Sequence, residues 1–369
     1  MSIETERRKL SHLEMALRKE VQSQRGTGFE DVHLIHRALP EINKNEIDLT
    51  CRILEFELKA PIILESMTGG TPSAARINAI LAEVAEDFQI GIGVGSQRAA
   101  VENPRLAYTY QIVRKKAPTA MVFANLGCAQ ITRGYGKEEV QKAIDMVDAN
   151  ALMIHVNPLQ ESVQLEGETN FRGTLSKIRE IAHEVGVPVI VKETGAGISK
   201  EVARAIEQTG VDGIDVAGAG GTSWAAVEYH RAKEMRNKIR ERLGKTFWSW
   251  GIPTAASVVE VVKSTGLMVI ASGGIRNGLH IAKAIALGAR ATGLALPALR
   301  SAAIARRSLR DMLSLLVEEL KTAMFLTGSR DLNELTKAPL VITGELCQWL
   351  EQRGINIQEY ARRTGASRS

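Results

Sequence analysis

Short apolar runs and helical stretches alternate along most of this chain. From residue 60 onward, the runs that have the length of a buried strand are residues 61–64, 90–94, 120–124, 151–156, 188–191, 213–216, 267–271 and 291–295. Helical patterns separate them, for example at residues 74–88, 138–149, 175–185, 200–208 and 279–287. Eight strand–helix units in succession predict an α/β fold, a closed (β/α)8 barrel. A doubly wound open sheet is the alternative, because one sequence does not reveal the order of the strands.

The segments on either side of the eight units predict further elements. Residues near 3–24 have the pattern of a charged helix with a thin apolar stripe, residues 26–50 form an irregular connector, and two short strands follow around residues 49–58. After the last strand we expect a long helix over residues 298–326 and a helical remainder to about residue 354. The predicted division is a helical arm and connector that covers the barrel mouth, residues 1–59, and a barrel with C-terminal helices, residues 60–369.

Polar residues and glycines follow nearly every predicted strand. The active sites of barrels are assembled from the carboxyl ends of several strands, so this distribution predicts one site supplied by every segment. A purely structural barrel would have no need of polar or charged side chains at corresponding places after four strands. These side chains are Arg98, Asn125, His155 and Lys192.

Glycines after the sixth and seventh strands predict a phosphate site. Glycine allows backbone N–H groups to approach an anion closely, and a helix N-terminus favours negative charge. Thr222 and Ser223 add hydroxyl groups to one loop, and Arg276 adds a guanidinium beside Gly273 and Gly274 in the next. The two loops together favour a nucleotide-type phosphate at the place where barrels commonly bind one.

Residues after earlier strands suit the ring of a flavin. Lys192 would place a cation where a reduced flavin carries negative charge. Thr68, Ser96 and Asn125 could form hydrogen bonds with the polar edge of the ring. No GxGxxG motif follows the first strand, which disfavours a Rossmann dinucleotide site.

The segment after the fourth strand predicts a divalent-cation site. Pro158 has no amide hydrogen for a sheet ladder and should end the strand, which leaves His155, Asn157, Gln160 and Glu161 at its mouth. Carboxylate and carboxamide oxygens are ligands for hard cations. A polar loop that caps the next helix is the alternative.

The N-terminal helix carries basic residues on one side. Arg8 and His12 are four residues apart and share a face, and Lys9 projects beside them. An ordinary surface helix would also show this pattern. The alternative is a helix that lies over the site.

Composition narrows the class of protein. The net charge of +5 favours anionic small molecules, and the chain lacks the basic stripe with interleaved aromatic residues that nucleic-acid binding would require. The three cysteines have no CxxC spacing, which fits a reducing compartment. The chain has no apolar run of membrane-spanning length. We expect a cytoplasmic protein with no nucleic-acid or membrane partner.

The order and spacing of the motifs resemble those of the type 2 isopentenyl-diphosphate isomerases, from about residue 7 to the end. The arm and the segment 155–161 are the most discriminating parts, whereas the second half of the barrel resembles FMN oxidases in general. The motifs are Arg8-Lys9…His12, Met67-Thr-Gly-Gly70, Gly95-Ser96, His155-Val-Asn-Pro-Leu-Gln-Glu161, Lys192-Glu193, Gly220-Gly-Thr-Ser-Trp224, Ser272-Gly-Gly-Ile-Arg276 and Trp349-Leu-Glu-Gln-Arg353.

The resemblance implies an FMN-dependent barrel enzyme that interconverts isopentenyl and dimethylallyl diphosphate. It further implies Mg²⁺, a flavin that is active in its reduced form, NADPH as the reductant, and self-association as a homo-octamer or homotetramer. Three residues would be catalytic: His155, Gln160 and Lys192.

The resemblance also assigns binding residues. The substrate would be bound by Arg8, Lys9, His12, Arg98, His155, Asn157 and Gln160, and Mg²⁺ by Glu161. The cofactor would be bound by Met67, Thr68, Gly69, Ser96, Asn125, Lys192, Thr222, Ser223, Gly273, Gly274, Arg276, Ala295 and Leu296. Whether Arg7 or Arg8 holds the diphosphate stays open.

Three other functions each require a different sequence feature or behaviour. A 2-hydroxyacid oxidase needs a histidine base after the sixth strand, where residues 220–224 contain none and His230 is the first to follow. An enzyme like inosinate dehydrogenase needs a nucleophilic cysteine there, and Cys51, Cys128 and Cys347 lie elsewhere. A flavin-sensing barrel would bind the cofactor without turnover of isopentenyl diphosphate.

Overall fold

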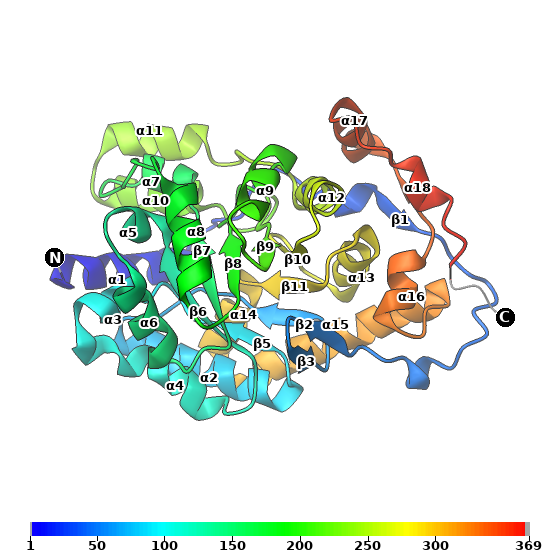
Figure 1. The fold of residues 1–369 in the computed structure, drawn as a ribbon, viewed down its shortest axis with the longest axis horizontal. Coiled ribbons are helices and arrows are strands. Elements are labelled where there is room, and N and C mark those ends of the chain that lie inside the picture. The colour runs from blue at the N-terminus through cyan, green and yellow to red at the C-terminus, as the bar shows by residue number, and fades with distance from the viewer. Residues whose placement is uncertain (1, 366–369) are drawn as a thin grey trace.

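A closed parallel barrel forms the centre of the protein in this computed structural model, which describes residues 2–365 and, for residues 2–6, the backbone alone (Figure 1). The strands lie in the order β10-β11-β4-β5-β6-β7-β8-β9, and the pairing of β11 with β4 closes the ring. The predicted (β/α)8 barrel is therefore confirmed. Its strands are β4 (Ile62–Leu64), β5 (Gly91–Gly93), β6 (Val122–Gly127), β7 (Ala151–His155), β8 (Val189–Lys192), β9 (Gly213–Asp215), β10 (Met268–Ser272) and β11 (Ala291–Leu294).

Helices surround the barrel, and their ends have recognisable local causes. Thr71 caps α2, where its hydroxyl accepts a hydrogen bond from the Ala74 amide at 3.2 Å, and Pro72 occupies the first turn. Gly288 ends α13 in the left-handed conformation, at a φ of 115°. The helices that follow β4 to β8 are α2 (Pro72–Phe88), α3 (Arg98–Glu102), α4 (Tyr108–Lys116), α5 (Cys128–Thr132), α6 (Lys137–Met146), α7 (Pro158–Val163), α8 (Thr174–Glu184) and α9 (Lys200–Glu207).

The second half of the barrel has longer connections. Within the described residues, three helices lie between β9 and β10, one lies between β10 and β11, and five follow β11. These are α10 (Trp224–Glu234), α11 (Lys238–Thr246), α12 (Thr254–Ser264), α13 (Gly278–Leu287) after β10, α14 (Leu296–Ile304), α15 (Arg306–Thr327), α16 (Leu332–Lys337), α17 (Gly344–Gln352) and α18 (Gln358–Ala361). None of the helices within the described residues is long and apolar enough to cross a membrane.

The N-terminal part packs on the barrel at two places. Helix α1 (Ser2–Arg18) contacts α10, α14 and α3, while β1 (Val32–Leu34) pairs with β12 (Leu340–Ile342) near the other end of the molecule (Figure 1). The two short strands expected around residues 49–58 are β2 (Cys51–Ile53) and β3 (Phe56–Leu58), which form an antiparallel pair. Short 3-10 helices cover Phe29–Asp31, Lys44–Glu46 and Pro104–Leu106.

Three predictions outside the barrel were wrong in detail. The first helix ends at Arg18 instead of near residue 24, because Val21 joins an extended segment and its carbonyl accepts a hydrogen bond from the Ser223 amide at 2.7 Å. The long helix after β11 is two helices, since Ala305 is extended (φ −169°, ψ 155°). The C-terminal remainder contains β12, whose strand conformation depends on pairing with a segment some 300 residues away.

Candidate active site

One cavity at the carboxyl ends of the barrel strands collects nearly all of the predicted site residues. It is bounded by loops from all eight strands and by α1. The predicted residues that line it are Arg8, Lys9, His12, Met67, Thr68, Gly69, Ser96, Arg98, Asn125, His155, Asn157, Gln160, Glu161, Lys192, Thr222, Gly273, Gly274, Arg276, Ala295 and Leu296. The structure thus brings together residues that are up to 288 positions apart (296 − 8).

Ser223 is the predicted residue that does not line this cavity. Its hydroxyl caps α10 by accepting a hydrogen bond from the Ala226 amide at 3.1 Å, and it donates to the Trp248 carbonyl at 2.6 Å. Both interactions hold the loop after β9 in place. The Ser223 side chain therefore positions the loop in this structure, and it lies outside the cavity lining.

Backbone from two neighbouring loops forms a glycine-lined cradle on one side of the cavity. Gly273 and Gly274 have φ values of 99° and 77°, which favour glycine. A Cβ atom at Gly221 would collide with the Gly274 backbone, so the loops after β9 and β10 touch one another. Asn277 begins α13 immediately afterwards by accepting a hydrogen bond from the His280 amide at 2.7 Å. Close backbone amides and a helix N-terminus make this side suited to a phosphate.

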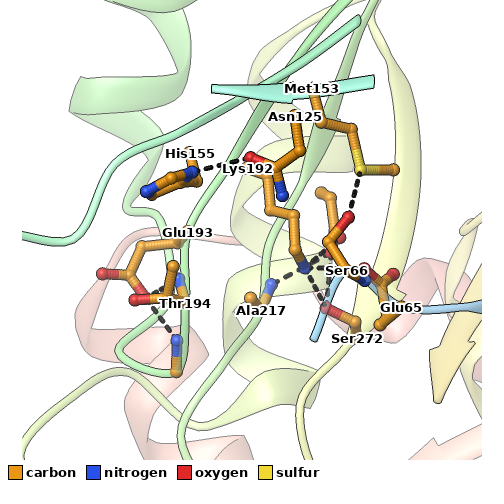
Figure 2. Close-up of polar contacts among 12 residues, drawn as sticks. Glu65, Ser66, Asn125, Met153, His155, Lys192, Glu193, Thr194, Ala217 and Ser272 are labelled. Carbon is orange, nitrogen blue, oxygen red and sulfur yellow. Dashed lines mark hydrogen bonds and ion pairs between the residues drawn. The ribbon is translucent and has the colours of Figure 1, made fainter. Parts of the chain in front are cut away.

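Lys192 forms ion pairs at the floor of the cavity (Figure 2). Its ammonium lies 2.9 Å from Glu65 Oε2 and 2.6 Å from Asp215 Oδ2, and it donates to the Ser272 hydroxyl at 3.4 Å. Burial by itself would lower the pKa of Lys192, but the Asp215 and Glu65 carboxylates outweigh it and raise the pKa. Neither acid was predicted as a site residue. The sequence did contain one indication of Asp215, because it is a charged residue within an apolar strand pattern.

Basic side chains gather on another side of the cavity, beneath α1. Lys9 donates hydrogen bonds to the Ser96 carbonyl at 2.6 Å and to the Tyr110 hydroxyl at 3.1 Å. Burial and the neighbouring Arg8 and Arg98 guanidinium groups together lower the pKa of Lys9 to about 7. Arg8 lines the cavity, whereas Arg7 is exposed. Mutually repelling cations that share a cavity favour an anion with several charges.

His12 on α1 is anchored by a hydrogen bond to an ion-paired acid, and burial lowers the pKa of its imidazole. Its Nε2 lies 2.7 Å from Glu228 Oε1, and Glu228 accepts a hydrogen bond from Arg231 at 2.6 Å. Arg231 also pairs with Glu166 at 3.0 Å. Glu228 and Arg231 belong to α10, so this network fixes the arm to the barrel. Neither residue was predicted.

His155 lies at the end of β7 and stays neutral near pH 7. Its Nδ1 is 2.7 Å from Asn125 Oδ1 (Figure 2), which makes Nδ1 the protonated nitrogen and leaves Nε2 as an acceptor. Burial lowers the pKa of His155 to about 4, and the positive charges of Lys192 and Lys9 act in the same direction. The imidazole is therefore suited to hydrogen bonding and less suited to anchoring an anion as a cation.

The segment after β7 forms a compact group of oxygen atoms. Asn157 Nδ2 donates to Gln160 Oε1 and to Glu161 Oε1, each at 3.0 Å. The other Glu161 oxygen accepts from Gln164 Nε2 at 2.6 Å and from the Glu168 amide at 2.7 Å. Burial raises the pKa of Glu161, and the amide donors partly oppose that effect.

Two buried oxygens in this group have no hydrogen-bond partner: Asn157 Oδ1 and Gln164 Oε1. Unpaired buried acceptors beside a carboxylate fit a hard cation such as Mg²⁺. The described residues contain no cluster of three or more histidine, cysteine, aspartate or glutamate side chains that could hold a metal. The residues therefore fit a cation that takes one carboxylate from the protein and the rest of its oxygen ligands from water and substrate.

The fold and the phosphate cradle define a class of flavin-binding barrels. A family model described as "FMN-dependent dehydrogenase" matches residues 137–342, more than half of the chain, so the chain belongs to that family. Solved structures agree on the fold. A lactate oxidase from Pediococcus acidilactici superposes with a TM-score of 0.64 at 15% identity, covering 90% of this chain and 87% of that one. A mandelate oxidase gives 0.62 at 19% identity, covering 93% and 98%.

Relatives of higher identity define the family more closely. The chain is 50% identical over 356 residues to the isopentenyl-diphosphate delta-isomerase of Methanosarcina mazei, covering 96% of this chain and 97% of that protein. It is 49% identical to the isopentenyl-diphosphate delta-isomerase of Methanothermobacter thermautotrophicus, covering 97% and 99%. The chain belongs to the isopentenyl-diphosphate delta-isomerase family, and the resemblance noted in the sequence is confirmed.

Proposed function

We propose that this protein is an isomerase that interconverts isopentenyl and dimethylallyl diphosphate with bound FMN and Mg²⁺. The observation that carries the proposal is the presence of two anion sites in one cavity. The loop after β9 contributes to the glycine-lined cradle, and the loop after β5 carries Arg98 beside Arg8 and Lys9. Strands β5 and β9 are four places apart in the eight-stranded ring and stand on opposite sides of it. One cavity can therefore hold a cofactor phosphate and a substrate diphosphate at separate ends.

The cradle residues would hold the phosphate of FMN, and Lys192 would lie toward the ring. Met67, Thr68 and Gly69 follow β4, Ser96 follows β5 and Asn125 lies in β6. In the ring, β5 and β6 stand three or four places from the cradle strands β9 and β10. Ala295 and Leu296 complete the lining on the side of the cradle. When it is bound in its reduced form, FMN supplies an electron-rich surface that can stabilise positive charge on a five-carbon chain.

The substrate diphosphate would be held by the basic residues beneath α1 together with Mg²⁺ on Glu161. Moving the double bond requires one proton to be added at the alkene and another to be removed next to the carbon that bears the diphosphate. Binding energy from the diphosphate, which does not react, would align the alkene. Gln160 lies in the cavity within hydrogen-bond distance of Asn157 and would assist the proton transfer, with the neutral His155 nearby as a donor or acceptor.

An anaerobic assay tests the proposal directly. The purified protein with FMN, dithionite and Mg²⁺ should convert isopentenyl diphosphate to dimethylallyl diphosphate, and oxidised FMN should support no conversion. A separate control with oxidised FMN and L-lactate in air tests for an oxidase, and no lactate should be oxidised. Equal isomerisation with oxidised and reduced FMN would contradict the proposal. NADPH as reductant, a cytoplasmic location and self-association as an octamer or tetramer stay predictions.

The substitution Glu161→Gln tests the metal role. The amide side chain would lack the anionic ligand but could keep hydrogen bonds in the same place, so FMN binding should be unchanged. We expect turnover in the presence of Mg²⁺ to fall by at least about a hundredfold, because the cation would lose its one protein carboxylate. Normal turnover at the same Mg²⁺ concentration would rule out the assignment. The exposed Glu138→Gln is the matched control.

A further inference from the structure

The cluster at the floor of the cavity joins opposite sides of the barrel. Glu65 follows β4 and Lys192 ends β8, and these strands are four places apart in the eight-stranded ring. The pair therefore spans the middle of the barrel (Figure 2). Asp215 at the end of β9 and Ser272 at the end of β10 complete the cluster. Exposed fractions of Glu65, Lys192 and Asp215 are 3%, 6% and 0%.

The cluster contains two carboxyl groups and one ammonium group. If both acids were ionised, the buried cluster would carry a net charge of −1. An uncompensated buried charge is costly, and two nearby carboxylates favour a proton on one of them. The charge count therefore predicts that one acid binds a proton under some conditions.

The two acids differ in their hydrogen-bond donors. Asp215 accepts from Lys192 at 2.6 Å, from the Ser272 hydroxyl at 2.6 Å and from the Ala217 amide at 3.3 Å. Glu65 Oε2 lies 2.9 Å from the Lys192 ammonium and accepts a hydrogen bond from the Ser66 amide at 3.4 Å, while its buried Oε1 has no partner. Burial and the Asp215 carboxylate on β9 raise the pKa of Glu65, the Lys192 ammonium on β8 opposes them, and together they bring it to about 7.

The residue that carries the unpartnered oxygen borders the cavity. Glu65 is among the residues that line it. A Cβ atom at Gly293 on β11 would collide with Glu65 Oε1, so glycine at this position leaves the space that the carboxyl group occupies. A proton on Glu65 would thus lie next to whatever binds on the cavity floor.

We propose that Glu65 is a redox-linked proton site, which takes up a proton when FMN in the cavity is reduced and releases it when FMN is oxidised. This inference rests on the proposed function, because it requires bound FMN. Two electrons and one proton from a hydride donor or dithionite in water give a reduced cofactor with one negative charge. One further proton from solvent converts the Glu65 carboxylate to the carboxylic acid. The total is two electrons and two protons, and the net charge at the cavity floor stays constant.

The pH dependence of the FMN midpoint potential tests this directly. Below about pH 7 Glu65 holds its proton in both redox states, so reduction takes up one proton and the potential falls by about 30 mV per pH unit. Above about pH 7 reduction takes up two protons, and the slope steepens to about 59 mV per pH unit. A ring that titrated by itself would show the opposite order, with the steeper slope at low pH. The measurement is spectroelectrochemistry of the FMN-loaded protein between pH 5.5 and 9.

Two substitutions should remove the bend in this profile. Glu65→Gln removes the proton-binding group, and Asp215→Asn leaves one carboxylate for one ammonium, which keeps Glu65 ionised. Both variants should show about 30 mV per pH unit throughout. Glu193→Gln is the matched control. Burial raises the pKa of Glu193 to about 7 as well, but its carboxylate accepts hydrogen bonds from the Thr194 and Gly195 amides outside the cluster.

The outcomes separate this inference from the proposed function. A protein that takes up no FMN would overturn both. Bound FMN with a single slope, or with a steeper slope below pH 7, would overturn the role of Glu65 and leave the isomerase proposal standing. A wild-type bend retained in Glu65→Gln would also overturn it. If Glu65→Gln does not retain FMN, the wild-type profile and Asp215→Asn still decide the question.

Discussion

The pKa of Lys9 leads to a specific prediction about how substrate binding depends on pH. Lys9 is partly buried, and its ammonium donates to a carbonyl and a hydroxyl at 2.6 and 3.1 Å, with no carboxylate among these partners. Burial and the charges of Arg8 and Arg98 lower its pKa to about 7. A bound diphosphate would favour the protonated form and raise that pKa. Protons and substrate should therefore bind cooperatively.

The magnitude follows from linkage. Binding is at full strength below the pKa of the free protein and weakens as the pH rises above it, by up to about tenfold or 1.4 kcal/mol per pH unit. Half of the Lys9 side chains are protonated at a pH equal to the pKa, and about 1% two units higher. Between pH 7 and pH 9 this single group should reduce kcat/KM about 50-fold.

The assay is the pH profile of kcat/KM for the wild-type protein, Lys9→Arg and Lys9→Met. The guanidinium of Lys9→Arg stays charged, so its kcat/KM divided by that of the wild type should rise about 50-fold between pH 7 and pH 9. Lys9→Met should lose most at pH 6 and little at pH 9, where the wild-type amine is already neutral. Because substrate phosphate and Glu65 titrate in all three proteins, the ratios isolate Lys9. An equal loss in Lys9→Met at both pH values would refute the reasoning.

Two further substitutions test the cradle and the C-terminal helices. Gly274 has a positive φ, and the Cβ atom of Gly274→Ala would collide with Thr27. This substitution should weaken FMN binding at least about tenfold in a fluorescence titration. Gly186 has open space around it, so Gly186→Ala should bind FMN normally. Glu260 is fully buried and accepts hydrogen bonds from one side chain of α17 and from the side chain of the residue that caps this helix. Glu260→Gln should therefore lower the free energy of unfolding by about 2–3 kcal/mol. The melting temperature should fall by several degrees. The exposed ion pair that Arg307 forms should contribute little to stability, so Arg307→Ala serves as the control. An unchanged melting temperature in Glu260→Gln together with a lower one in Arg307→Ala would contradict this account.

The sequence by itself determined the barrel and most of its cavity. Strand-length apolar runs set the eight strands, and the polar residues after each run had to meet because parallel strands of a barrel end on one face. Asn125, His155 and Lys192 could be predicted in this way, as could the glycine loops around Gly273. Local patterns of this kind depend on neighbours in the chain and can be read without the fold.

Only the tertiary structure decided which distant groups touch. The pairing of β1 with β12 and the hydrogen bond that holds His12 to α10 depend on contacts across hundreds of residues. Ser223 carries the expected hydroxyl, but the local need to cap α10 turns it away from the cavity. Glu65 was not predicted as a site residue, and its charged partners Lys192 and Asp215 come from two other strands. The pKa of such a group depends on burial and on charges brought together by barrel closure, and no local sequence pattern encodes either quantity.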